Sequence, residues 1–201
     1  MTQPASRRDE LLKLAATMFA ERGLKATTVR DIADSAGILS GSLYHHFKSK
    51  EEMVLEVLQD FLDWLFERYQ QILAAESTPL DRLTGLFMAS FEAIEHRHAQ
   101  VVIYQDEAKR LSDLPQFGFV DDRNREQRKM WIDLLHEGIA DGSFRPDLDV
   151  DLVYRFIRDT TWVSVRWYQP GGPLTAEQVG AQYLAIVLGG ITAESDKAES
   201  H

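Results

Sequence analysis

Residues 28–50 predict two short helices joined by a tight turn, and they read TVRDIADSAGILSGSLYHHFKSK. The first helix starts at Thr28 and Asp31, whose side chains can cap backbone N–H groups that have no partner inside the helix. Gly37 then allows the backbone to turn sharply, because glycine has no Cβ. A second short helix is predicted over 39–46. Two helices joined in this way are the pattern of a helix-turn-helix.

The second of these helices has a buried and an exposed side. Leu43 and Phe47 are four residues apart, so both face the core. The side chains left outside are small or able to form hydrogen bonds. They belong to Ser40, Gly41, Ser42, Tyr44 and His45. Such a surface suits a helix that presses into the major groove of DNA.

Helices are predicted through the rest of the chain as well. Pairs of Ser or Thr with an acid or amide three residues later are typical helix starts. They occur at Ser6/Asp9, Thr28/Asp31, Ser49/Glu52, Thr78/Asp81 and Thr175/Gln178. All six prolines lie before a helix, at its first position or between helices. The predicted helices are 7–22, 29–35, 39–46, 50–75, 79–95, 97–111, 121–140, 149–168 and 175–191. We therefore expect an all-α fold of about nine helices.

The helix predicted over 50–75 is long enough to join two domains. Apolar residues recur along it at intervals of three and four. They are Val54, Val57, Leu58, Phe61, Leu62, Leu65, Tyr69 and Ile72. At about 1.5 Å per residue this helix spans roughly 39 Å. We place the domain boundary at its start, with one domain at 1–50 and the other at 51–201.

Charge is distributed unevenly between these two parts. The whole chain carries −10. Residues 1–50 hold eight Lys/Arg against five Asp/Glu, a net +3, so the remainder carries −13. A basic segment on an acidic body is expected when only that segment meets DNA.

Composition narrows the cellular context. The 201 residues are 44% hydrophobic, enough for a real core, yet no apolar run reaches the roughly 18 residues of a membrane span. The N-terminus lacks the apolar segment of a signal peptide. There is no cysteine, which excludes disulfides and zinc thiolates and suits a reducing compartment. We expect a cytoplasmic protein without membrane contact.

No enzyme motif is present. His96 and His98 are two residues apart, so on a helix they point to different faces and cannot share a metal ion. Glu107 and His136 have no motif partner, and there is no glycine-rich phosphate loop. We expect no catalytic residue, no metal and no cofactor. A helical ligand carrier or scaffold that does not bind DNA is the alternative from another class.

Four N-terminal segments resemble the signature of the TetR family of DNA-binding repressors. They are FAERG at 19–23, TVRDIA at 28–33, AGI at 36–38 and GSLYHHFKSK at 41–50. The resemblance implies a three-helix DNA-binding domain at 1–50. It also implies a C-terminal helical domain, at 51–201, that binds a ligand and forms a homodimer.

The same resemblance implies roles for single residues. Those implied to contact phosphates are Thr28, Tyr44, His45 and Lys50. Those implied to lie near base edges are Arg30, Ser40, Gly41 and Ser42. Leu39 stands where the family often has the serine that caps the recognition helix, so Ser40 is the expected cap. Taken singly, Gly41 could instead relieve packing and Lys50 could be a solvated charge.

Bulky apolar residues of the C-terminal part are candidates for lining a ligand pocket. They are Trp64, Phe87, Met88, Phe91, Tyr104 and Trp131. A set of this kind suits a large hydrophobic molecule. For any one of them, a place in the ordinary core is the alternative.

The helix predicted over 149–168 places arginines in an apolar, mostly buried setting. Arg158 and Trp162 are one turn apart and share a face. A buried guanidinium needs an anion or a carbonyl as partner. The candidates are Asp159, a carboxylate across a dimer, or a group of the ligand.

The last predicted helix, 175–191, is suited to a dimer interface. One side carries Val179, Tyr183, Ile186, Val187 and Gly190. Small residues permit close approach of another helix, and they are Gly180, Ala181, Ala185 and Gly189. Homodimers pair identical patches, so two such helices from each subunit could form a four-helix seam.

A second resemblance covers nearly the whole chain. The segments QDEA at 105–108, DRN at 122–124, RKMW at 128–131 and 144–167 resemble the actinobacterial TetR-type repressors of genes for lower sterol-ring degradation. One short recognition helix reads few bases, so a dimer is expected to bind a palindromic DNA operator with one half-site for each subunit. The resemblance implies an inducer that is a steroid-derived acyl-CoA, the coenzyme A thioester of an indanedione propionate. Another acyl-CoA or hydrophobic inducer is the alternative.

Overall fold

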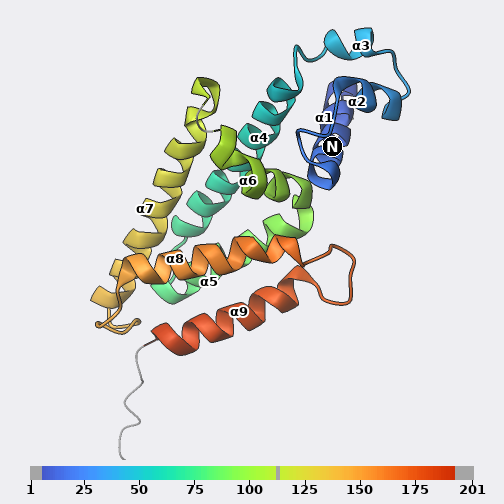
Figure 1. The fold of residues 1–201 in the computed structure, drawn as a ribbon. Coiled ribbons are helices and arrows are strands. Elements are labelled where there is room, and N and C mark those ends of the chain that lie inside the picture. The colour runs from blue at the N-terminus through green and yellow to red at the C-terminus, as the bar shows by residue number, and fades with distance from the viewer. Residues whose placement is uncertain (1–5, 112–113, 193–201) are drawn as a thin grey trace, which may run out of the picture. The chain divides into compact units, whose positions relative to one another are not determined.

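The protein is all-α, as predicted. The computed structural model describes residues 6–111 and 114–192, which contain nine α-helices and two short 3-10 turns (Figure 1). The helices are α1 Arg7–Arg22, α2 Val29–Ser35, α3 Ser40–Tyr44, α4 Lys50–Leu73, α5 Pro79–His96, α6 His98–Leu111, α7 Gly118–Ala140, α8 Val150–Val163 and α9 Ala176–Ile191. Within these residues the only extended pairing is an isolated antiparallel bridge between Phe144 and Thr192.

Helix boundaries follow the predictions closely, except at α3 and at the end of α8. α3 is shorter than expected because Leu39 is extended, and it forms no side-chain capping bond. Ser40 is the first helical residue, so its expected role as the cap is wrong. The helix predicted over 149–168 is α-helical only to Val163 and tightens into a 3-10 turn over Ser164–Arg166.

The predicted capping pairs form at the helix starts. Complete reciprocal boxes are present at Ser6/Asp9, Thr28/Asp31, Thr78/Asp81 and Thr175/Gln178. The fifth pair differs. Ser49 Oγ accepts a hydrogen bond from the Glu52 backbone at 3.1 Å, but the Glu52 carboxylate accepts from the backbone N–H of Lys48.

The described residues divide into two compact units, and the first comprises 6–64 and 97–123 without 112–113. Inside it, α1 packs against α2 and α6, and α2 packs against α3. The core side chains of the N-terminal helices are Leu11, Ala15, Met18, Phe19, Ile32, Ala33, Leu43 and Phe47. Arg8 joins α1 to α4 through an ion pair with Glu56, and its guanidinium lies 4.4 Å from the Phe47 ring centroid.

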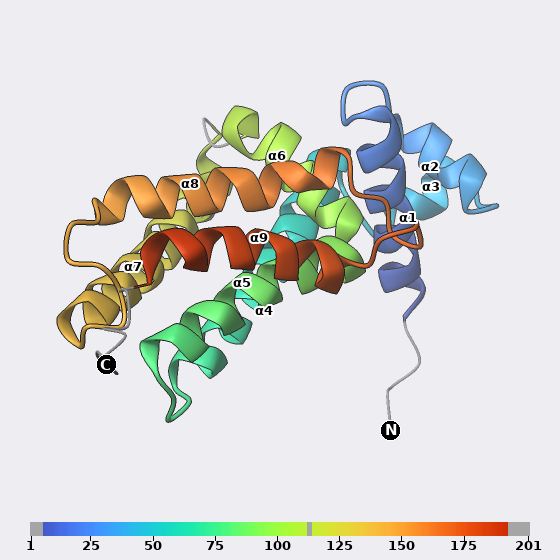
Figure 2. The same ribbon diagram turned by 90° about the horizontal axis from the view of Figure 1, so that it is seen from below.

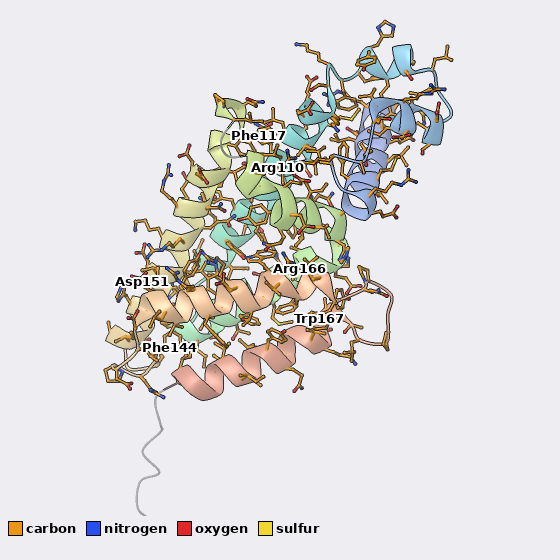
Figure 3. The ribbon with its side chains drawn as sticks, viewed as in Figure 1. Arg110, Phe117, Phe144, Asp151, Arg166 and Trp167 are labelled. Atoms are coloured by element: carbon orange, nitrogen blue, oxygen red, sulfur yellow. The ribbon has the colours of Figure 1, made fainter. Side chains whose placement is uncertain are left out.

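The second unit comprises 65–96 and 124–192. α9 packs along α5, and Figures 1 and 2 show α8 and α9 side by side with opposite chain directions. The α5–α9 contact depends on Gly180, where an added Cβ would lie 3.1 Å from the Phe91 ring and 3.2 Å from the Met88 sulfur. Phe144, labelled in Figure 3, packs against α7 at Gly138 in the same way.

The predicted burial of side chains is correct for the long helix α4 and wrong for one side of α8. Along α4, every predicted apolar residue is buried except Ile72, which is half-buried. α8 was expected to be mostly buried, but in the single chain one side of it faces solvent. Its large exposed apolar residues, with Trp167 just beyond it (labelled in Figure 3), are Leu152, Phe156, Val163 and Trp167.

None of the helices described is long and apolar enough to cross a membrane. α4 and α7 each contribute residues to both compact units. The compact units therefore differ from the functional division at residue 50, which stays a prediction.

Candidate functional site

The turn between α2 and α3 has the geometry that a helix-turn-helix needs. Gly37 has φ +67°, in the left-handed region that favours glycine. The backbone N–H of Gly37 donates to Asp34 at 3.1 Å, and that of Ile38 donates to Ala33 at 3.0 Å. These two bonds form a Schellman motif, which satisfies carbonyls at the end of α2. The direction of α3 is thereby fixed by backbone hydrogen bonds.

α3 presents polar and small residues to solvent, as the sequence predicted. Leu43 is buried, whereas Gly41, Ser42, Tyr44 and His45 are exposed and Ser40 is half-buried. A Cβ added to Gly41 would meet no atom within 4 Å. Internal packing therefore does not require glycine at this position, which removes one of the two explanations for it.

Side chains from separate segments line one open groove beside α3. Four of them were predicted from the sequence, and they are Thr28, Arg30, Tyr44 and Lys50. Val29, Lys48, Ser49 and Glu51 complete the groove. Lys48 and Ser49 were not predicted, although both stand inside the quoted signature. The structure thus brings α2, α3 and the start of α4 to one surface.

Two of these residues also hold the domain together. The Thr28 hydroxyl donates to the Asp31 carboxylate at 2.6 Å, and this hydrogen bond is the main reason that the pKa of Asp31 lies below its ordinary value. Lys50 Nζ donates to the carbonyls of Leu24 at 2.7 Å and Thr27 at 3.1 Å. Lys50 is therefore not simply a solvated charge, because it ties the start of α4 to the loop after α1.

Leu39 lies on this surface, although it is not among the predicted site residues. Its side chain is 83% exposed, beside the exposed residues of α3. The signal was available, since Leu39 had been recognised as a departure from the family pattern. A large apolar side chain left in water at this place needs an explanation.

A separate cavity of about 20 Å³ lies within the second unit, between α4, α5, α7 and α8. It is lined by Tyr69, Ser90, Gln127, Trp131, Tyr154, Ile157, Arg158, Thr161 and Trp162. Three of these were predicted ligand residues, namely Trp131, Arg158 and Trp162. This volume is far below that of a typical ligand pocket, so a bound ligand would have to widen the cavity.

Arg158 stands at the open side of this cavity. Its side chain is 46% exposed and pairs with Asp159, with Nε donating to Oδ1 at 2.8 Å. Of the partners considered for this arginine, Asp159 is the one that the unliganded chain provides. The guanidinium also lies 5.8 Å from the ring centroid of Tyr154, and burial raises the pKa of the Tyr154 hydroxyl.

The other predicted ligand residues lie elsewhere. Phe87 and Phe91 pack on each other with centroids 5.5 Å apart, and Met88 and Phe91 line an open groove beside the start of α9. Trp64 and Tyr104 belong to the first unit. There, Trp64 carries the Arg97 guanidinium 4.7 Å from its ring, and Tyr104 packs on Phe61 at 5.9 Å.

Several cavity residues were missed, although helical spacing pointed to two of them. Gln127 is one turn before Trp131, and Thr161 is one turn after Arg158, so each shares a face with a predicted residue. Tyr69, Ser90 and Tyr154 gave no such signal. Among the residues that the structure describes, no cluster of His, Cys, Asp or Glu is placed to hold a metal ion.

Comparison with known proteins agrees with both parts of this arrangement. The profile for bacterial regulatory proteins of the tetR family matches residues 11–57, and the profile for a tetracyclin repressor-like C-terminal domain matches 76–191. The chain therefore belongs to the TetR family of transcriptional regulators. It is a regulator and not an enzyme, as expected.

Several repressors are similar to this chain over nearly their whole length. The HTH-type transcriptional repressor KstR2 of Mycolicibacterium smegmatis is 85% identical over 98% of this chain and 96% of the relative. KstR2 of Rhodococcus jostii is 56% identical over 93% and 92%. The solved structure of the ketosteroid transcriptional regulator KstR2 of Mycobacterium tuberculosis has a TM-score of 0.93 at 76% identity, over 96% of this chain and 98% of that chain. Both resemblances found in the sequence are confirmed.

Proposed function

We propose that this protein represses genes of sterol degradation by binding a palindromic operator as a homodimer, and that a small-molecule inducer releases it. The observation that carries this proposal is the similarity to KstR2 repressors along nearly the whole chain. One of these relatives is described as a ketosteroid regulator. The similarity includes the C-terminal region, where ligand specificity is expected to reside.

The proposed DNA contacts combine phosphate and base recognition. Tyr44 and Lys50, with Thr28 and His45, would contact phosphates and so position α3 without reading sequence. Ser40, Gly41, Ser42 and Arg30 would lie near base edges. The absence of any side chain at Gly41, where the structure leaves open space, supports close approach of α3 to the bases.

The proposed dimer surface is formed by α8 and α9. Its exposed apolar residues are Leu152, Phe156, Val163, Trp167 and Ile186. Contiguous exposed apolar residues of this size mark interaction sites. In a homodimer the same patch would be used twice, once by each subunit.

The proposed inducer is a steroid-derived acyl-CoA, the thioester of an indanedione propionate. The small two-ring acyl group would enter the cavity between Trp131 and Trp162, whose flat apolar rings line it, and would widen it from its unliganded volume of about 20 Å³. The cavity is too small to enclose the adenine nucleotide as well. Coenzyme A would therefore extend past Arg158 toward solvent, where its negative charges meet an exposed cation.

Release from DNA would be a shift of population. The inducer must bind a form with altered spacing of the two α3 helices better than it binds the DNA-competent form, because equal affinity for both would change nothing. α4 is one continuous helix that contributes to both compact units. It is the natural element to carry the change.

The experiment that tests this function is operator binding by purified protein, with its own upstream DNA, in the presence and absence of acyl-CoA thioesters. Arg158→Met and Trp162→Ala should need about ten- to a hundredfold more thioester for release, since a charged hydrogen bond is worth roughly 1.5–3 kcal/mol. Their affinity for DNA should hardly change. Arg155→Met, an exposed arginine of α8 that does not line the cavity, is the matched control.

The alternatives give different results in the same experiment. If Arg158 serves only its ion pair with Asp159, Arg158→Met should lower the melting temperature and leave inducer response per folded dimer intact. Release by a straight-chain acyl-CoA in preference to the indanedione thioester would identify another inducer class. A ligand carrier without DNA binding would show no salt-sensitive retention on DNA.

A further inference from the structure

Two polar side chains inside the cavity lack hydrogen-bond partners. Gln127 is 8% exposed and Thr161 is 2% exposed. Within the described part of the chain, neither Gln127 Nε2 nor Thr161 Oγ1 has a partner, and both residues line the cavity. A buried polar group without a partner destabilises the folded protein. Two such groups in one cavity suggest that a ligand supplies the missing bonds.

Other hydroxyl groups nearby are satisfied within the protein. Ser90 Oγ donates its proton to the Leu86 carbonyl at 2.9 Å and therefore accepts from the Tyr69 hydroxyl at 2.6 Å. On α8, Thr160 Oγ1 donates to the Phe156 carbonyl one turn earlier at 2.7 Å. A threonine on a helix can always satisfy its hydroxyl in this way. Thr161, the next residue, does not.

The chemistry of the two groups defines what they can bind. Gln127 Nε2 offers two N–H donors and Thr161 Oγ1 offers one O–H donor, so an oxygen acceptor suits both. A carboxylate would need a cation, because burying an unpaired charge is costly. Arg158 is the only cation among the lining residues, and it is half-exposed and paired with Asp159. The acceptor is therefore an uncharged oxygen.

We infer that Gln127 and Thr161 bind a ring ketone of the inducer from facing walls of the cavity, α7 and α8. This inference rests on the proposed function, which supplies the keto-acyl thioester. It adds separate roles for these residues. The buried amide of Gln127 and hydroxyl of Thr161 bind the ring oxygen, whereas the exposed Arg158 binds the negative charges of coenzyme A. These two residues would then distinguish a ring ketone from an unoxidised ring of the same shape.

The test uses Gln127→Met and Thr161→Val, which keep the approximate shape and remove the polar atoms. Two thioesters are compared in operator release, the indanedione propionyl-CoA and the same bicyclic propionyl-CoA without ring oxygens. For the diketone, each variant should need about tenfold more thioester than the wild type. For the ring without oxygens, wild type and variants should respond alike.

Thermal melting without ligand separates this role from a structural one. Because neither atom has a partner to lose, both variants should melt at or above the wild-type temperature. Ser90→Ala provides the contrast, since it removes the hydroxyl that accepts from Tyr69 and should lower the melting temperature. Lower melting of Gln127→Met and Thr161→Val would overturn the inference.

Failure of the inference and failure of the proposed function are distinguishable. If the diketone thioester releases the wild type and both variants from the operator equally well, only the assignment of Gln127 and Thr161 is wrong. If neither thioester releases the wild type from the operator, the proposed inducer is wrong, and the ketone assignment with it.

Discussion

Single side chains around α3 are expected to contribute to DNA binding in different physical ways. Tyr44 is 54% exposed, whereas Leu43 beside it is fully buried. Leu39 is apolar and exposed, so it cannot form hydrogen bonds to either phosphates or base edges. These differences allow positioning and sequence reading to be tested one residue at a time.

Tyr44→Ala should weaken binding to all operator variants by a similar factor. A phosphate contact positions the helix and carries no sequence information. Loss of one hydrogen bond to a charged group predicts roughly a tenfold or greater reduction in affinity. Binding curves over a set of single-base operator variants measure this, and a change of preference at one base pair would contradict the role assigned to Tyr44.

Leu39 should contact a thymine methyl group, which is the apolar feature of the major groove. Replacing thymines of the operator singly with uracil removes only this methyl. At one position in each half-site, wild-type affinity should fall roughly fourfold, the value of burying one methyl group. With Leu39→Ala the same uracil should have no effect. Equal losses in both proteins would exclude the contact.

At the scale of elements, the helix-turn-helix contains two exposed glycines with different roles. Gly37 has a positive φ and ends α2, whereas Gly41 is inside α3 with free space around it. The first glycine is required by backbone conformation. No described residue lies close enough to require the second, and we expect close approach to DNA to be its role.

Alanine at these two positions should separate folding from binding. Gly37→Ala should lower the free energy of unfolding by about 1 kcal/mol or more, because alanine is strained at positive φ. Gly41→Ala should leave stability unchanged or raise it by up to about 1 kcal/mol through higher helix propensity, while weakening operator binding. Thermal melting and operator titration of both variants check this. Full DNA affinity in Gly41→Ala would show that α3 does not approach the bases closely there.

For the whole molecule, the exposed apolar side of α8 implies that the single chain is not the final assembly. Phe156 is 54% exposed in the chain alone. A dimer places two recognition helices about 34–36 Å apart, one turn of DNA, which one short α3 cannot achieve by itself. Operator binding should therefore depend on residues far from DNA.

Phe156→Glu should produce a folded monomer that has lost operator binding. The side chain is exposed in each chain, so folding should tolerate the change, but a dimer would have to bury the new charge. Light scattering gives the mass and circular dichroism the helix content. Lys129→Glu, an exposed charge reversal on α7, is the control and should remain dimeric. A stable dimer of Phe156→Glu would move the interface to another surface.

The sequence by itself determined the helices and the DNA-binding surface. Helix starts depend on pairs three residues apart, such as Thr28 and Asp31, and helix faces on spacings of three and four, so neighbours along the chain suffice. The turn at Gly37 is equally local. Thr28, Arg30, Tyr44 and Lys50 could be named before the groove that they line was known, because the resemblance to the TetR signature implied their roles.

Only the tertiary structure decided which residues share the cavity and which side of α8 stays uncovered. The cavity joins α4, α5, α7 and α8, so Tyr69 and Thr161 meet although more than ninety residues separate them. Periodicity shows that Phe87 and Trp131 are apolar, but not that the first packs on Phe91 and the second faces the cavity. The unpartnered atoms of Gln127 and Thr161 likewise depend on every neighbour in space, because a hydrogen bond requires a donor and an acceptor at short distance.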